Sequence, residues 1–465
     1  MNEKTDEIRK ELSVWLEEKT RQFVEDIDGL VRIPSVAKPP VAIQTGEEAP
    51  FGEACREVLE KMLSYAVRDG IPCMNHEGYC ASLTVGEGGH EIGIWNHLDV
   101  VPAGGGWRYE PFALHQEGDF IIGRGVQDNK GPAIAVYYAL LFCEQKKLLR
   151  NIRVRQILGC QEESGMEDVK YYIAHYAAPE FSFVADCSFP VCCGEKGICR
   201  VTLQAKERTK QFTILEGGVA CNSVPGSALA EIIIDGQKER KEAFGVSGHG
   251  AFPEGTKNAI GALAEQLQDY PLGDREKNVV TFLQCAGADG YGRGLGIECE
   301  DTCSGKLTCN AGILRMEEGR PSLELDIRYP VTAQIQGILE KIQQKAREYG
   351  FEIIRSHDDP PHYMEKEQPF VTLLMEAWRK EKGGTEEAYV MGGGTYARHI
   401  PRAVGFGTGM EKDLSGLNLP EGHGNCHCAD EVESICNLKK AILIYVRALQ
   451  NIDNWYAEQN KEIPD

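Results

Sequence analysis

The stretch "IWNHLDVVPAGGGW", from Ile94 to Trp107, places two strongly polar side chains at the end of an apolar run. Successive side chains of a strand alternate between its two faces, so His97 and Asp99 point the same way. A proline and three glycines follow and indicate that the strand ends here. Because ligands bind at the carboxyl ends of strands in open α/β sheets, this pair is a candidate for half of a binding site.

The composition is that of a large, acidic, globular chain. Its 465 residues exceed one ordinary hydrophobic core, which predicts two domains. With 42% hydrophobic and 26% charged residues, the chain has the composition of soluble globular proteins. The formal net charge of −21 disfavours nucleic acid and anionic membranes as partners, because both are negatively charged.

The N-terminus and the cysteines predict a cytoplasmic protein. The first residues, "MNEKTDEIRKELSVWLEEKT", have the pattern of a charged amphipathic helix rather than a signal peptide, and no apolar run has the length of a membrane span. The 17 cysteines are therefore expected to be reduced thiols. No C-x-x-C motif is present, so a cysteine-based zinc site is not expected.

Helix and strand patterns alternate in the first part of the chain. Apolar spacing predicts helices over 4–30, 51–67 and 131–147, and short apolar runs predict strands at 91–96, 152–159 and 181–186. Such alternation is typical of an α/β domain with a largely parallel or mixed sheet.

A different pattern begins at about residue 194 and predicts a second, α+β domain. Strand patterns at 198–205, 228–235, 306–316 and 322–330 surround helical patterns near 257–270 and 332–348. The α/β pattern returns after "PPHYMEKEQPF" and ends in a helix predicted over 431–450. We therefore expect one domain, 1–193 and 361–465, that is interrupted by an inserted domain, 194–360.

Further polar side chains follow predicted strands or precede predicted helices. They are Asp128 in "GRGVQDNKGPA", Glu162 and Glu163 in "ILGCQEESG", Asp186 in "FVADCSFP", and His423 and His427 in "GHGNCHCADEV". Each can face one crevice at the carboxyl edge of the sheet. Imidazoles and carboxylates without thiolates are the ligands of a hydrolytic zinc, manganese or cobalt centre, in which one carboxylate can bridge two ions about 3.5–4 Å apart.

Each motif taken alone has an ordinary structural explanation. A His-x-Asp at a strand end, a Glu-Glu-Ser in a loop and an aspartate in a glycine turn all occur commonly without a ligand. The segment "MGGGTYAR" lacks the Gly-Lys-Ser/Thr ending of a phosphate loop, so we reject that interpretation. The interpretation as a site depends on the succession of acidic or histidine strand ends, all at α/β boundaries.

Several motifs also occur in a recognisable order: "HLDVVPAGGGW", "GRGVQDNKGP", "EESG", "EKG", "GHGAFPEGTKNA", "DIRYP", "GGGTYAR" and "HCADE". Together they resemble the co-catalytic dinuclear zinc peptidases, which include glutamate carboxypeptidases, aminoacylases and succinyl-diaminopimelate desuccinylase, and they look most like PepV-type bacterial dipeptidases. The resemblance covers nearly the whole chain. It implies a three-layer α/β metallopeptidase domain with a mixed sheet and an inserted α+β lid domain.

The resemblance implies a set of metal ligands. His97 and Asp186 would bind one ion, Glu163 and His427 would bind the other, and Asp128 would bridge both. The two divalent ions are expected to be zinc, with manganese or cobalt as alternatives.

The resemblance also implies two roles beside the metals. Asp99 would hold the His97 imidazole in the correct tautomer, as histidine ligands of zinc commonly require. Glu162 would be the general base, which takes a proton from the attacking water and passes it to the leaving amine. Two metal ions would lower the pKa of that water and stabilise the oxyanion.

In the inserted domain the resemblance points to substrate contacts. His249 matches a lid histidine that stabilises the oxyanion, and Asn222 and Arg328 match polar contacts to substrate. An arginine fork suits a terminal carboxylate, so dipeptides with a free C-terminus are the expected substrates. Alternatively, Arg328 forms an ordinary ion pair in the sheet and His249 is a loop residue.

The "GGGTYAR" motif and the length of the lid complete the expectations. Gly393, Gly394 and Thr395 would let the backbone approach the substrate, because glycines leave space that side chains would fill. In the PepV-type dipeptidases that the chain resembles, a lid as long as 194–360 closes the site within one chain, so the resemblance implies a monomer.

The sequence departs from the family pattern near the site. Asn129 stands where a second aspartate is usual, which removes a charge there. Cys426 and Cys428 flank His427, and His423 is a competing candidate for the last ligand. We prefer His427 because it leads directly into the final predicted helix.

Two other functions remain as alternatives. An N-acyl amino acid deacylase would use the same metal site on a different substrate. A metal-binding or peptide-binding protein without activity is disfavoured by Glu162, because a binder needs no base.

Overall fold

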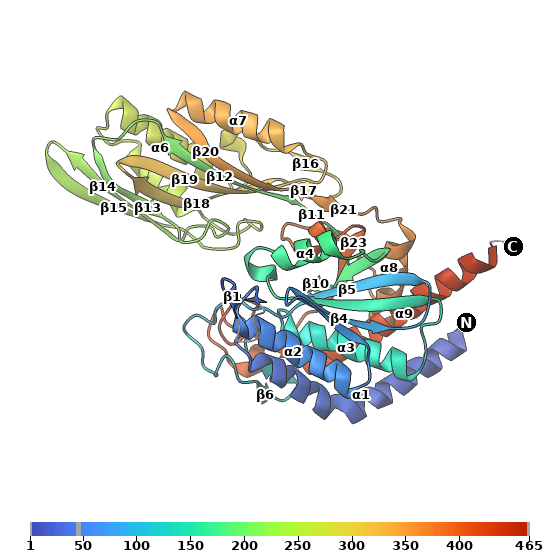
Figure 1. The fold of residues 1–465 in the computed structure, drawn as a ribbon. Helices are drawn as coiled ribbons and strands as arrows, with labels where there is room; N and C mark the ends of the chain where they lie inside the picture. Colours follow the sequence, from blue (N-terminus) through green and yellow to red (C-terminus); the bar gives the residue numbers. More distant parts are fainter. Residues whose placement is uncertain (1, 43–47, 463–465) are drawn as a thin grey trace. The chain divides into compact units, whose positions relative to one another are not determined.

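The computed structural model describes residues 2–42 and 48–462, which form two compact units (Figure 1). The first unit takes in the chain up to Cys193, the segment Met364–Tyr389 and the chain from Thr395 onward. The second consists of Gly194–Tyr363 and Val390–Gly394. Among the described helices, none is both long enough and apolar enough to cross a membrane.

The first unit is built on an α/β pattern. Its helices are α1 (Asn2–Val31), α2 (Glu53–Arg68), α3 (Lys130–Gln145), α4 (Glu167–His175), α8 (Pro369–Lys382) and α9 (Ile435–Glu462). Its longer strands are β3 (Cys73–His76), β4 (Cys80–Val85), β5 (His90–His97), β8 (Ile152–Gly159), β9 (Phe181–Val184) and β23 (Ala403–Phe406). Shorter strands are β1 (Val41–Ala42), β2 (Glu48–Ala49), β6 (His115–Glu117), β7 (Phe120–Ile122), β10 (Cys187–Ser188), β24 (Thr408–Gly409) and β25 (Val432–Ser434).

The main sheet of this unit is mixed. Its strands run in the order β23-β9-β5-β8-β4-β3. The central strands β23, β9, β5 and β8 are parallel to one another, whereas β4 pairs antiparallel with β8, and β3 pairs antiparallel with β4. The strand β11 (Val191–Glu195) pairs beside β23 and carries the chain out of the unit. This sheet confirms the prediction of an α/β domain with a mixed sheet.

Helices cover both faces of the sheet, which gives three layers (Figure 1). On one face lies α3, whose residues are almost all buried, as expected for a helix that is apolar on all sides. On the opposite face Val169 and Tyr172 of α4 pack against Trp95, Ile157 and Val184 of the sheet. Side chains therefore alternate along each strand between these two helical layers.

The second unit is an antiparallel sheet with three helices. Its longer elements are β12 (Gly197–Ala205), β13 (Phe212–Gly217), β14 (Ser227–Ile234), β15 (Gln237–Phe244), α5 (Ala259–Leu267), α6 (Asp274–Gly287), β18 (Thr308–Glu317), β19 (Arg320–Tyr329), α7 (Ile335–Glu348) and β20 (Phe351–Asp359). Its short strands are β16 (Glu300–Asp301), β17 (Gly305–Lys306) and β21 (His362–Tyr363), and β22 (Tyr389–Met391) lies at a boundary between the units.

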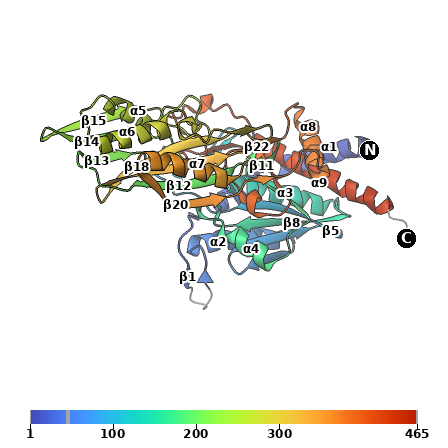
Figure 2. The same ribbon diagram turned by 90° about the horizontal axis from the view of Figure 1, so that it is seen from above.

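The sheet order in this unit is β15-β14-β13-β18-β19-β12-β20, with every pair antiparallel. Buried apolar residues of α5, α6 and α7 pack on the sheet and form one core with it (Figure 2). Asn258 begins α5, because its side chain accepts hydrogen bonds from the amides of Ile260 and Gly261. The α+β pattern expected for this segment is therefore present.

One helix was missed in the sequence, and the predicted start of another helix was wrong. The helix α6 was missed between two predicted ones, although Val279, Val280, Phe282 and Leu283 are buried on it. The last helix begins at Ile435 rather than at 431, because Val432–Ser434 pairs with β7 as strand β25. Three extended residues before a helix carry no helical period that the sequence could reveal.

Candidate metal centre

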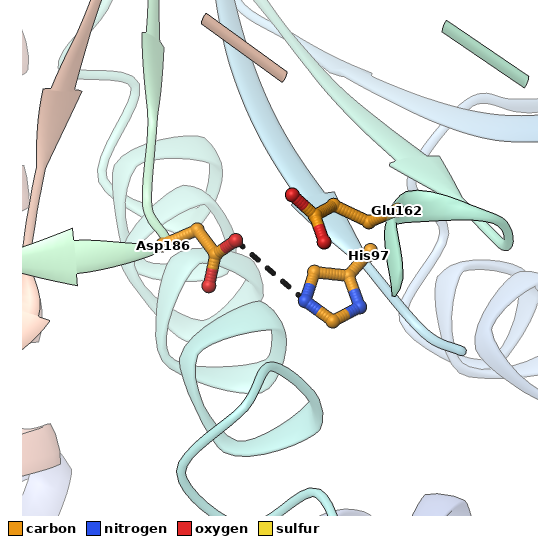
Figure 3. Close-up of side chains that lie close together, drawn as sticks. All are labelled: His97, Glu162 and Asp186. Atoms are coloured by element: carbon orange, nitrogen blue, oxygen red, sulfur yellow. Dashed lines mark ion pairs between the residues drawn. The ribbon is translucent and has the colours of Figure 1, made fainter. Parts of the chain in front are cut away.

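The central strands of the first unit place three polar side chains at one edge of the sheet. Strand β5 lies between β8 and β9 and is parallel to both, with His97 paired to Gly159. The short 3-10 helix Glu162–Ser164 follows β8, and Asp186 follows β9. Because parallel strands end at the same edge, the side chains of His97, Glu162 and Asp186 lie together, as Figure 3 shows.

Asp128 lies at the centre of the cluster, between two histidines. Its Oδ1 is 2.9 Å from His97 Nε2, and its Oδ2 is 3.0 Å from His427 Nε2. His97 Nε2 is also 3.6 Å from Asp186 Oδ2, and His427 Nε2 is 3.1 Å from Glu163 Oε2. Each oxygen of one carboxylate thus faces a different imidazole, which is the arrangement that a bridging ligand requires.

The cluster contains two overlapping groups of ligand atoms. One is His97, Glu162 and Asp186, and the other is His97, Asp128 and Glu163; within each group the atoms lie within 4.8 Å of one another. Among the residues that the structure describes, no further group of three or more such ligands lies this close together. The donor chemistry, nitrogen and carboxylate oxygen, suits a hydrolytic divalent metal.

The histidines bind protons strongly in the absence of a cation. Burial disfavours a charged imidazole at His97, but the carboxylates of Asp186, Asp128 and Asp99 outweigh it and raise its pKa well above the usual value. Hydrogen bonds to Asp128 and Glu163 raise the pKa of His427 to about 11. Burial would raise the pKa of Asp128, yet hydrogen bonds from both histidines lower it.

Two carboxylates in the cluster have the opposite shift. Burial, reinforced by the negative charge of Asp186 and Glu163, raises the pKa of Glu162 well above its usual value despite His97. Burial likewise raises the pKa of Asp186 to about 7, with His97 opposing the shift and Asp128 adding to it. The cluster therefore holds more negative charge than its two histidines neutralise, and divalent cations would supply the balance.

Asp99 connects the imidazole to the turn that carries the two glutamates. Its carboxylate is fully buried and accepts hydrogen bonds from the amides of Glu162 and Glu163, both at 3.2 Å. Its Oδ1 also lies 3.3 Å from His97 Nδ1, and its carbonyl oxygen lies 3.0 Å from the same nitrogen. One buried carboxylate thus orients both the ring and the turn.

The structure places His427, and not His423, in the cluster. His423 Nδ1 lies 2.7 Å from Asp430 Oδ2, and the other oxygen of Asp430 accepts hydrogen bonds from the amides of Arg108 and Tyr109. His423 therefore belongs to a loop contact. Neither cysteine beside His427 belongs to the two ligand groups.

Two buried carboxylates that hold the site were missed in the sequence. Glu431 Oε1 accepts hydrogen bonds from the amides of Gly125, Gln127 and Asp128 at 2.9–3.1 Å, and its Oε2 is 2.7 Å from Arg124 Nη1. These contacts fix the loop that ends in Asp128. No local pattern indicates them, because the partners lie about three hundred positions earlier in the chain.

The second missed carboxylate is Asp168 in α4. Its Oδ2 accepts hydrogen bonds from the amides of Cys160 and Gln161, both at 2.7 Å, and from the hydroxyl of Tyr396. Gly159 has no room for a side chain here, since a Cβ would lie 2.3 Å from Asp168 Oδ2 and 2.1 Å from Tyr396 Oη. Asp168 and Tyr396 therefore pack tightly against the start of the turn that carries Glu162.

The second unit brings together two of the other predicted residues. A β-bridge pairs Ser223 with His249, and the amide of Gly250 donates to the carbonyl of Asn222 at 2.7 Å. The amide of Ala251 donates to His249 Nδ1 at 3.2 Å, so a neutral ring carries its proton on Nε2. Asn222 and His249 thus share one pair of loops.

Arg328 is already engaged within the second unit. Its Nε and Nη2 donate to both oxygens of Asp326, at 2.6 and 2.9 Å, and its Nη1 donates to the carbonyl of Gly392 at 3.1 Å. The ion pair in the sheet that we considered as an alternative is therefore present. These contacts use one of the two N–H bonds on each terminal nitrogen, so one N–H bond on Nη1 and one on Nη2 remain as donors.

The glycines of the "GGGTYAR" motif belong to the second unit, whereas Thr395 belongs to the first. A Cβ on Gly393 would meet only the Met391 sulfur, at 3.9 Å, so there is space at this position. Gly394 closes the second unit, and Thr395 belongs to the first. The Thr395 hydroxyl accepts a hydrogen bond from the amide of Ala397 and begins the 3-10 helix Tyr396–His399.

Comparisons with known proteins agree with this geometry. The model for Peptidase family M20/M25/M40 matches residues 93–451. A relative from Bacillus subtilis (strain 168), named putative dipeptidase YtjP, is 31% identical over 469 residues, which cover 93% of this chain and 98% of the relative. The Beta-Ala-Xaa dipeptidase of Lactobacillus delbrueckii subsp. lactis is 29% identical, with 94% and 97% covered. The solved structure of the di-peptidase Dug1p from Saccharomyces cerevisiae has a TM-score of 0.59 at 13% identity and covers 98% of this chain and 99% of that one, which is a likeness of fold.

Proposed function

The chain belongs to peptidase family M20/M25/M40, and from this premise we propose that it hydrolyses dipeptides with a free C-terminal carboxylate at a centre of two divalent cations. The observation that carries the proposal is the position of Asp128, whose two oxygens face two different histidines. The names of its relatives, a putative dipeptidase and a Beta-Ala-Xaa dipeptidase, support a short peptide as substrate.

The ligands divide into two sets that share Asp128. His97 and Asp186 hold one cation, and Glu163 and His427 hold the other. Zinc is the cation that best fits imidazole and carboxylate donors in a hydrolytic site without thiolates. We assign the activity to the cytoplasm, because 17 cysteines without a C-x-x-C motif suit a reducing compartment.

The two cations, when bound, activate water and polarise the peptide carbonyl. Glu162 is the group that moves the proton: it takes one from the attacking water and gives it to the leaving nitrogen. In the protein without cations, burial and the neighbouring carboxylates raise the pKa of Glu162. Asp99 keeps His97 and the Glu162 turn in fixed orientation.

The second unit supplies groups for the two ends of the substrate and acts as a lid. His249 donates from Nε2 to the oxyanion, a contact of a kind that contributes about 10²–10³ in rate. The remaining N–H bonds of Arg328 Nη1 and Nη2 bind the C-terminal carboxylate of the substrate. Asp326 fixes the orientation of the guanidinium through Nε and Nη2. Asn222, Gly393, Gly394 and Thr395 line the path of the substrate backbone.

The length of the second unit, Gly194–Tyr363, supports a monomer in which His249 serves the site of its own chain. Mixing the inactive variants His249→Ala and Glu162→Ala tests this directly. No recovery of activity is expected, whereas recovery would show that the histidine is supplied across a dimer.

A substrate comparison on metal-reconstituted protein tests the proposed function. Alanyl-alanine-type dipeptides, the matching tripeptides, dipeptide amides, and N-acetyl and N-succinyl amino acids are compared by kcat/KM under one condition. Free dipeptides should be the best substrates and tripeptides poorer, because the proposal gives Arg328 the carboxylate of the residue that directly follows the scissile bond. Preferred hydrolysis of the acylated amino acids would instead identify a deacylase on the same site.

A further inference from the structure

Three buried side-chain amides connect Asp186 of the metal centre with helix α3. Gln156, Asn96 and Asn129 are buried, with exposed fractions of 0%, 0% and 1%. Gln156 Nε2 donates to Asn96 Oδ1 at 3.1 Å, Asn96 Nδ2 donates to Asn129 Oδ1 at 2.7 Å, and Asn129 Nδ2 donates to Asp186 Oδ1 at 2.7 Å. The three amides form one continuous chain that ends on a carboxylate of the cluster.

The direction of every hydrogen bond in this chain is fixed by its surroundings. Each amide nitrogen gives its second hydrogen to a backbone carbonyl: Gln156 to Ala133 at 2.9 Å, and Asn96 and Asn129 to Ala185 at 3.2 and 2.8 Å. Carbonyl and carboxylate oxygens only accept, so turning any amide over would place two acceptors against each other. All the side-chain N–H bonds of the three amides are therefore used, and the hydrogen bonds that join one side chain to the next all run toward Asp186.

The chain separates the roles of the two Asp186 oxygens. Oδ1 is held by Asn129, whereas Oδ2 lies 3.6 Å from His97 Nε2, on the side of the ligand cluster shown in Figure 3. A carboxylate with one oxygen held by a buried donor cannot rotate freely about its last bond. Asp186 consequently presents one defined oxygen to the centre.

We propose that Gln156, Asn96 and Asn129 are positioning residues that fix Asp186 for one of the two cations. The proposal rests on the metal centre of the proposed function and gives Asn129 a role that an ionised aspartate could not fill. Only an amide can accept from Asn96 and donate to Asp186 at the same time. An ionised aspartate there would place its oxygens against Asp186 and the Ala185 carbonyl, with no hydrogen to donate.

Two substitutions with opposite electrostatic effects test the proposal. Asn129→Asp keeps the shape, removes the donors and adds a negative charge, which by itself would attract a cation more strongly. Asn129→Leu has a similar volume and removes donors and acceptor without adding charge. Both substitutions should weaken the binding of one zinc ion by roughly 10- to 100-fold. The other ion should bind nearly as in the wild type, because Glu163 and His427 do not contact the three amides.

The measurement is stepwise zinc binding to the metal-free protein, by competition with a chromophoric chelator, with thermal melting alongside. Asn437→Asp is the matched control, because Asn437 is 8% exposed, lies in the same unit and donates to the Glu411 carbonyl outside the cluster. It should change melting but not zinc affinity. Gln156 is the amide farthest from Asp186, so Gln156→Leu should reduce zinc affinity at the same ion by a smaller factor. This variant tests the proposal if the Asn129 variants do not fold.

The outcomes separate this proposal from the peptidase assignment. Wild-type or tighter zinc binding in both Asn129 variants would overturn it, as would an equal loss at both ions. If the wild type binds two ions with this pattern but hydrolyses no dipeptide, the positioning chain stands and the proposed function fails.

Discussion

Replacing Glu431 with glutamine should weaken folding and metal binding together. One oxygen of Glu431 accepts hydrogen bonds from three backbone amides, including that of Asp128, and the other accepts from Arg124. Both side chains are buried, with exposed fractions of 0% and 1%. Glutamine keeps the shape but has only one oxygen, so either the amides or the guanidinium must face an NH2 group.

The expected loss follows from what is left without a partner. If the NH2 group faces Arg124, a buried cation loses its anion, which costs about 3–5 kcal/mol. If it faces the three amides, each unsatisfied donor costs about 1–3 kcal/mol, so the total loss is at least as large, about 3–9 kcal/mol. Because the same loop ends in Asp128, zinc affinity should also fall by roughly 10- to 100-fold.

Glu433→Gln separates the two effects. Glu433 is 2% exposed, pairs with Lys412 at 3.2 Å and accepts from the amide of Ser434, but it does not contact the Asp128 loop. Urea unfolding of the metal-free proteins should show a loss of stability in both variants, whereas chelator competition should show weaker zinc binding only in Glu431→Gln. Equal zinc affinity in the two variants, or wild-type stability of Glu431→Gln, would refute the reasoning.

Three further results are expected. Glu162→Gln should keep its zinc, because the turn is held by backbone amides, yet kcat should fall by roughly 10²–10⁴-fold; normal turnover at full zinc content would remove it from the mechanism. Arg328→Ala should lower kcat/KM for a free dipeptide by roughly 10- to 150-fold, the weight of charged hydrogen bonds of about 1.5–3 kcal/mol, and should leave the dipeptide amide unaffected; the loss is modest because Asp326 already compensates the arginine. Burial, with the charge of Arg155 adding to it, lowers the pKa of His76 in the folded protein. Below about pH 6.5 the unfolded chain therefore binds a proton more readily than the folded chain, so the stability of the fold decreases as the pH is lowered. Relative to His76→Gln, the wild type should therefore lose stability between pH 7 and pH 5 in urea unfolding, and parallel pH profiles would contradict this.

Part of the site follows from local pattern. His97 and Asp99 are two apart at the end of a strand, and Glu162 and Asp186 follow the two strands that flank it. Parallel strands bring such ends to one edge whatever the rest of the fold does. That is why the sequence alone could predict which side chains meet.

What the sequence could not show depends on contacts between distant segments. Glu431 is bound to amides near residue 125, about three hundred positions away, and Asp168 accepts from the hydroxyl of Tyr396, 228 positions away. The amides of Asn96 and Gln156 look like ordinary polar residues in apolar strands. Their role becomes visible only when two neighbouring strands and α3 are placed together.

For Arg328, the ion pair in the sheet that we considered as an alternative also has a local signal in the sequence. Asp326 stands two residues earlier on the same strand, β19, and residues two apart share one face. An ion pair between them was therefore predictable. It changes the expected cost of removing the substrate carboxylate, because the guanidinium keeps an anion in either case.

Zinc titration of the metal-free protein, followed by dipeptide hydrolysis, tests the two-cation centre most directly. The Asp128 carboxylate between His97 and His427 predicts that activity rises until about two ions are bound per chain, that excess chelator abolishes it, and that His97→Ala or Asp128→Ala loses zinc together with rate. Full activity in excess chelator, or a plateau at one ion per chain, would contradict the two-cation centre.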